Sequence, residues 1–100
     1  WLSPAILRFL SRVVKQCNAA DVPVTVCGEM GGRALEAIAL LGLGIDRLSI
    51  TPVSVGPIKA MIRSLNLADA RSLMEGYLRN PPASIRQSLG EWAIQHKVEI

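Results

Sequence analysis

The sequence predicts a single α/β domain in which helices alternate with short strands. Its 100 residues lie within the usual size range of one domain. Hydrophobic residues make up 50% of the chain and charged residues 19%, which is enough for a core and too apolar for a disordered tail. Apolar segments with helical spacing alternate with two short strand-like runs, and this order favours parallel strands joined by helices.

The first predicted helix covers Pro4–Ala19. The Ser3 hydroxyl can cap the free amides of its first turn, and proline is tolerated at the first helical position. Apolar residues recur along it at helical spacing. They are Ile6, Leu7, Leu10, Val13, Val14 and Cys17. Asp21-Val22-Pro23 breaks this helix, and the β-branched run Val24–Cys27 then predicts a buried strand.

A second helix is expected over Ala34–Leu41, where the glycines of Gly42-Leu43-Gly44 can supply its left-handed cap. Leu48–Ile50 is the second predicted strand, and it ends at Thr51-Pro52 because proline cannot donate to a ladder. Ser54 is expected to cap the third helix. Two strands cannot make a complete sheet, so the predicted sheet needs further strands.

Two helices with polar faces close the sequence. Asn66 is the expected cap of Leu67–Arg79, and Ser84 begins a helix over Ile85–Lys97. We therefore divide the chain into strand–helix units over residues 1–66 and a helical extension over residues 67–100.

Charge and cysteine content argue against several classes of partner. The net charge of +3 comes from scattered basic residues, so we expect no nucleic-acid or anionic-membrane partner. No uninterrupted apolar stretch reaches the roughly 18 residues of a membrane span. Cys17 and Cys27 have no metal-binding spacing, and we expect reduced thiols in a cytoplasmic protein.

One motif could carry chemistry: Cys27-Gly28-Glu29-Met30-Gly31-Gly32, which lies at the carboxyl end of a predicted strand. Ligands of parallel α/β folds bind at such ends. A free thiol with a pKa of about 8.5 is mostly protonated and suits a proton donor, whereas a helix dipole would favour a thiolate nucleophile. The residues alone leave both roles open, together with simple packing of Cys27 at the strand end.

The other candidate residues have simpler explanations. Cys17 lies on the apolar stripe of the first helix, where packing is expected, and Glu29 could be a solvated loop carboxylate or a catalytic one. Gly31-Gly32-Arg33 could hold a phosphate or carboxylate, as in a stand-alone phosphate-binding domain, but two glycines are a weak signal. His96 is expected at the surface, favoured by the dipole of the last helix.

Specific sequence motifs stand at Val24–Met30, Leu40–Ile45 and Leu48–Pro52. Together they resemble the end of the phosphoenolpyruvate-utilising barrel that Enzyme I of the phosphotransferase system shares with pyruvate phosphate dikinase. The stretch Gly56–Leu65 and the closing pair of helices look most like the nitrogen-type Enzyme I. The resemblance covers essentially the whole chain.

The resemblance implies that residues 1–66 are the last two strand–helix units of a TIM (β/α)8 barrel, followed by a two-helix carboxyl-terminal extension. The missing strands would leave edges exposed, so the isolated chain could be largely helical. It also implies that Cys27 is the proton donor to enolpyruvate, with Gly28 and Glu29 shaping the pocket rim.

The whole enzyme would move a phosphoryl group from phosphoenolpyruvate to its own histidine, and then to a phosphocarrier protein. Its Mg²⁺ ligands, phosphate-binding arginines and phosphorylated histidine would lie outside this chain, which is therefore expected to hold no metal ligands and to be inactive alone. A homodimer is expected. The alternative is that Asn66–Ile100 is a non-catalytic helical module for dimerisation or regulation.

Overall fold

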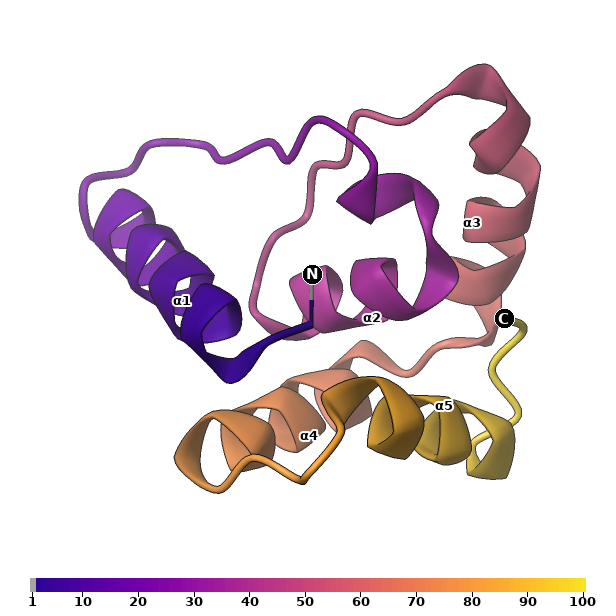
Figure 1. The fold of residues 1–100 in the computed structure, drawn as a ribbon. Coiled ribbons are helices and arrows are strands. Elements are labelled where there is room, and N and C mark those ends of the chain that lie inside the picture. Colours follow the sequence, from indigo (N-terminus) through magenta and orange to yellow (C-terminus); the bar gives the residue numbers. More distant parts are fainter. Residues whose placement is uncertain (1) are drawn as a thin grey trace.

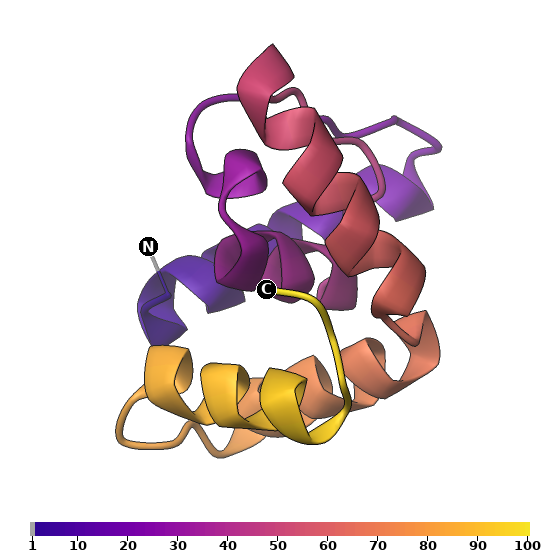
Figure 2. The ribbon, with the colours of Figure 1, turned by 90° about the vertical axis from the view of Figure 1, so that its right-hand side faces the viewer.

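A computed structural model describes residues 2–100, which form five α-helices and a short 3₁₀ turn (Figure 1). The elements are α1 (Pro4–Ala19), η1 (Met30–Gly32), α2 (Ala34–Gly42), α3 (Pro52–Ser64), α4 (Leu67–Arg79) and α5 (Ile85–Gln95). The helix α2 lies centrally, with α1 and α3 on either side. The antiparallel pair α4 and α5 forms a layer below it, as the turned view in Figure 2 also shows. Within these residues no helix is both long and apolar enough to cross a membrane.

The core is built around α2. Its residues Ala37, Ile38, Ala39 and Leu40 have no exposed surface. The helix contacts η1, α3, α4 and α5, while Leu40 joins a smaller apolar cluster with Val14 of α1. A helix that is apolar on all sides has to be covered on all sides, so the other helices are arranged around it.

Three helix starts follow from local capping, and the structure confirms all three. The side chains of Ser3, Asn66 and Ser84 each accept a hydrogen bond from the backbone amide three residues ahead, at 3.1–3.2 Å. The bounds predicted for α1 and α4 agree with the structure. A cap acts within one turn of the helix, so it can be recognised in the sequence without knowledge of the tertiary fold.

The two predicted strands do not form as ladders in the described part of the chain. Val24–Cys27 and Leu48–Ile50 are extended, but they share one parallel bridge, between Val26 and Leu48. Thr25 and Cys27 are exposed, so the expectation of a buried strand was wrong. With no third segment alongside, one bridge is all that two such short runs form, and the chain is largely helical, as expected for isolated closing units.

Three helix boundaries differ from the prediction. The third helix begins at Pro52 with Thr51 at its N-cap position, not at Ser54, because proline fits the first helical turn. The last helix ends at Gln95 rather than Lys97, whose φ of 56° is left-handed. The second helix extends by one residue to Gly42 before the chain turns.

Polar contacts tie the terminal segments to the helices. The Arg8 guanidinium of α1 donates to the carbonyl oxygen of Leu78 at the end of α4, at 3.1 Å from Nη2. The Glu99 amide donates to the Ser64 hydroxyl at 2.8 Å, which holds the carboxyl-terminal tail against the end of α3 (Figure 1). These contacts link the helical extension to elements from the first part of the chain.

A glycine sets the spacing between α2 and α4. A Cβ atom on Gly42 would lie 2.5 Å from Met74 Cγ and 2.8 Å from the Ala70 carbonyl oxygen. We predict that Gly42→Ala destabilises the fold by about 1–3 kcal/mol, because the backbone of α4 has to move. The matched control is Gly76→Ala, where nothing lies within 4 Å. It should stabilise the helix by about 0.5–1 kcal/mol. Urea unfolding measures both, and equal effects would contradict this account of the contact.

The outer side of α1 predicts self-association. Ile6 is 43% exposed and Phe9 is 66% exposed. Burying such apolar surface is favourable at about 25 cal/mol per Å², and a second copy is the nearest partner. Light scattering at micromolar concentration should report a dimer or a larger species, which Phe9→Ser should shift toward the monomer. A monodisperse monomer that melts cooperatively would contradict this prediction.

Candidate functional site

The candidate site lies where the two extended segments end together. The Val26 amide donates to the Arg47 carbonyl at 3.0 Å, and the Ser49 amide donates to the Val26 carbonyl at 2.8 Å. Because the bridge is parallel, both segments leave it in the same direction. Cys27 therefore follows the bridge on the same side as Ser49. This is the edge at which the sequence predicted the Cys-Gly-Glu motif.

An open hollow of about 590 Å³ lies beyond this bridge. The residues that line it are Gly28, Glu29, Gly32, Arg33, Ser49, Ile50, Thr51 and Ser54. They come from the turn after the first segment, the second segment and the start of α3. Gly28 has a left-handed φ of +96°, which lets the chain turn sharply after Cys27.

The glycine turn fits closely against the second segment. A Cβ atom on Gly31 would lie 3.2 Å from Ile50 Cγ2 and 3.3 Å from Leu48 Cβ. One on Gly32 would lie 3.2 Å from the Ser54 hydroxyl. The two glycines therefore let the turn pack closely against the wall of the hollow.

Two of the three predicted site residues line the hollow, and the third lies next to it. Gly28 and Glu29 line the hollow. Cys27 is solvent-exposed and precedes Gly28 at the edge of the hollow, rather than lining it. Cys17 is partly buried on α1. His96 is exposed, with its ring stacked on Trp92 at 4.4 Å between ring centroids.

Two hydroxyl groups at the start of α3 were not predicted as site residues. The Thr51 and Ser54 hydroxyl oxygens lie 3.1 Å apart, and both residues line the hollow. In the sequence Thr51 marks the end of a strand and Ser54 the start of a helix. Because these local roles explain both residues, the sequence gives no sign that they also line a site. Hydroxyls beside an arginine can bind a small anion, such as a phosphate or a carboxylate.

Ion pairs connect the charged residues that line the hollow to a buried carboxylate in α2. Arg33 forms an ion pair with Glu29 and another with Glu36, and Arg86 of α5 donates a hydrogen bond to Glu36. Glu36 is fully buried. The sequence analysis did not predict that Glu36 is buried and paired. A single charge within an otherwise apolar helix does indicate that the side chain needs a partner of opposite charge.

The described residues do not supply a metal site. Among residues 2–100 no three His, Cys, Asp or Glu side chains come together in a way that could hold an ion. The acidic residue that lines the hollow, Glu29, is already paired with Arg33. These donors do not fit a divalent cation, which needs several oxygen ligands.

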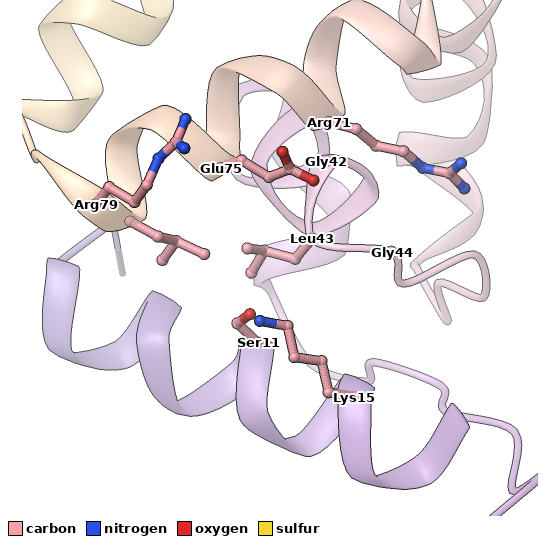
Figure 3. A pocket seen from close by; sticks show the side chains of 9 residues that line it. Ser11, Lys15, Gly42, Leu43, Gly44, Arg71, Glu75 and Arg79 are labelled. Carbon is pink, nitrogen blue, oxygen red and sulfur yellow. The ribbon is translucent and has the colours of Figure 1, made fainter. Parts of the chain in front are cut away.

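A second hollow, of about 390 Å³, lies at the other end of α2, between α1 and α4 (Figure 3). Lys15 and Ser11 face it from α1, and the Glu75 carboxylate faces it from α4. Arg71 and Arg79 also line it from α4. This mixed set of exposed charges has no common target, so the hollow beside the Cys-Gly-Glu motif is the better candidate site.

Comparisons with known proteins agree with the resemblance found in the sequence. The family model described as "PEP-utilising enzyme, PEP-binding domain" matches residues 1–67. A phosphoenolpyruvate-protein phosphotransferase of Haemophilus influenzae is 31% identical over 97% of this chain and 17% of its own length. Enzymes of the same name from Haloferax volcanii and Bacillus subtilis are 40% and 36% identical. Each of these two matches covers 76% of this chain, and 14% and 13% of the respective relative.

The chain thus spans less than a fifth of the length of these relatives. The matched residues 1–67 contain the Cys-Gly-Glu motif, both extended segments and every residue that lines the hollow beside them. On this evidence the chain belongs to the family of phosphoenolpyruvate-utilising enzymes and carries part of their PEP-binding domain.

Proposed function

We propose that this chain is the carboxyl-terminal part of a phosphoenolpyruvate-protein phosphotransferase, and that Cys27 is its proton donor. The observation that carries the proposal is the position of Cys27, an exposed thiol at the common end of two parallel segments and beside an open hollow. The names of the relatives supply the reaction class. The substrate is then phosphoenolpyruvate, and the acceptor of the phosphoryl group is a phosphocarrier protein.

The proposed chemistry has two steps at the substrate. An enzyme histidine outside this chain attacks phosphorus, and the bond between phosphorus and the enol oxygen breaks, which leaves enolpyruvate as its enolate. The Cys27 S–H bond then gives its proton to the methylene carbon, which becomes the methyl group of pyruvate. Solvent returns a proton to the thiolate. The phosphohistidine passes its phosphoryl group to the carrier protein.

The rest of the site would be completed by other parts of the protein. Arg33 and the hydroxyls of Thr51 and Ser54 can contact an anion at this edge, but the phosphate-binding arginines are proposed to lie outside the chain, as are the Mg²⁺ ligands. Gly28 and Glu29 would shape the pocket rim. The parallel bridge would be a remnant of two neighbouring barrel strands, and additional strands would extend it on both sides.

The cellular setting and assembly follow from the same proposal. Cys17 and Cys27 are both free thiols, which a reducing cytoplasm would maintain. A homodimer would cover apolar surface of the kind that α1 exposes. The stretch Gly56–Leu65 leads us to propose the nitrogen type of Enzyme I as the nearest functional class.

The role of Cys27 can be tested in the full-length protein. Cys27→Ala should lower the rate of pyruvate formation by about 10²-fold or more, the scale expected for the loss of a general acid. Binding of phosphoenolpyruvate should persist, since the thiol does not hold the substrate. Cys17→Ala is the matched control, and its turnover should stay within a few-fold of the parent. Equal activity of the two variants would rule out the assignment.

The isolated chain should be inactive. It lacks the histidine that would accept the phosphoryl group, because its one histidine, His96, lies in the turn after α5 and stacks on Trp92. We expect no calorimetric binding of phosphoenolpyruvate at millimolar concentration, and no label from the radioactive substrate with Mg²⁺ present. Saturable binding or stable labelling would show that the chain carries a complete site of its own.

A further inference from the structure

Glu36 is a charged side chain at the buried start of α2. It has no exposed surface, and every other residue of α2 is apolar or glycine. One carboxylate oxygen, Oε1, accepts a hydrogen bond from Nη2 of Arg86 on α5. The other oxygen, Oε2, is buried without a hydrogen-bond partner. A buried carboxylate with an unused acceptor is unfavourable, so its position calls for a physical reason.

Arg33 stands between this buried carboxylate and the candidate site. Its Nε lies 3.9 Å from Oε2 of Glu36, and its Nη2 lies 3.8 Å from Oε2 of Glu29. Both are ion-pair distances that are too long for hydrogen bonds. Arg33 also lines the hollow beside the Cys-Gly-Glu motif. Its guanidinium is therefore held by charge from two sides and remains free to donate.

We propose that Arg86, Glu36 and Arg33, called the Glu36 clamp below, position the turn from Glu29 to Arg33, which is separated from Cys27 by one residue. A series of ion pairs joins Arg86 of α5 to Glu36, Glu36 to Arg33, and Arg33 to Glu29. Glu29 lies two residues after the Cys27 thiol. The effect on turnover rests on the proposed function, whereas the effect on the turn does not. Glu36 and Arg86 are positioning residues, because they act through Arg33.

A purely structural role explains the Glu36 clamp less well. Well-packed apolar side chains usually stabilise a core as much as a buried ion pair does. The pair joins residues that are fifty positions apart, and Arg86 lies in the extension beyond the residues matched by the family model. The series of ion pairs ends at Arg33 and Glu29, and both of these residues line the hollow. The extension is thereby connected to a turn in the PEP-binding domain.

The arrangement predicts what happens when the clamp is broken. Without Arg86, the one cation left within 4 Å of Glu36 in the described residues is Arg33. The buried carboxylate should then draw the guanidinium toward Oε2 and away from Glu29. Where Glu36 is removed as well, Arg33 loses the ion pair that ties it to α2, so in both cases the turn loses a link to the helices. The turn from Glu29 to Arg33 is held by two backbone hydrogen bonds, Gly32 N to Glu29 O and Arg33 N to Met30 O, both at 3.2 Å. It should open more often.

Four variants of the chain separate positioning from stability. Arg86→Ala breaks the clamp, and Arg86→Lys keeps the positive charge. The double variant Glu36→Leu with Arg86→Leu removes the charges and preserves apolar packing, so the protein should remain folded even if Arg86→Ala does not. Arg71→Ala is the control, an arginine on α4 with no ion pair among the described residues.

Amide hydrogen exchange of the chain is the direct readout. In Arg86→Ala and in the double variant, the Gly32 and Arg33 amides should exchange at least about fivefold faster, while the Leu7 amide at the start of α1 is unchanged. Arg86→Lys should fall between these variants and the parent, and Arg71→Ala should match the parent. Unchanged exchange at Gly32 and Arg33 in the double variant overturns the proposal, as does an equal rise at Leu7.

Kinetics of the full-length protein test the consequence for turnover. The double variant should lower kcat for pyruvate formation by about tenfold or more, with the KM for phosphoenolpyruvate within threefold, because misplacing a reacting group slows chemistry more than binding. If Cys27→Ala proves fully active while the exchange result holds, the proposed function fails and the clamp stands. If the Gly32 and Arg33 amides do not exchange faster in the double variant, the proposed role of the Glu36 clamp is wrong, whatever the kinetics show.

Discussion

The fold depends on the complete burial of α2. Its central residues Ala37–Leu40 have no exposed surface, and each fully buried large aliphatic side chain contributes about 1.5–3 kcal/mol. The rest of the chain is arranged to cover this helix, and Gly42 allows α4 to approach it closely. The same helix begins directly after the glycine turn. The glycine turn after Cys27 and the packing of the core therefore both adjoin one element.

Features that act within one turn of chain could be predicted from the sequence, and features that need a distant partner could not. Ser3, Asn66 and Ser84 cap their helices as expected. The predicted strands failed as ladders, since a strand is stabilised by neighbours on both sides and residues 2–100 provide one short neighbour each. The start of α3 was misplaced because Pro52 and Ser54 both suit a first helical turn.

The candidate site shows the same division. The motif Cys27-Gly28-Glu29 identifies one wall of the hollow from the sequence alone, because a thiol followed by a glycine turn is a pattern of adjacent residues. Thr51 and Ser54 reach the site only through the register of the parallel bridge. Glu36 and Arg86 meet across the interface of α2 and α5, so the sequence could show that the buried charge needs a partner but not which one. The extension over residues 67–100 thus takes part in the core, and its Arg86 contacts the buried carboxylate that pairs with Arg33 of the candidate site.

The central claim is that Cys27 delivers the proton to one face of enolpyruvate. The most direct measurement is the stereochemistry of the pyruvate methyl group, formed by the full-length protein in D₂O from phosphoenolpyruvate carrying tritium at one methylene position. The parent protein should give one methyl enantiomer, and Cys27→Ala should give a racemate, because released enolpyruvate is protonated in solution on either face. A single enantiomer from Cys27→Ala would show that another group is the donor and would contradict the account.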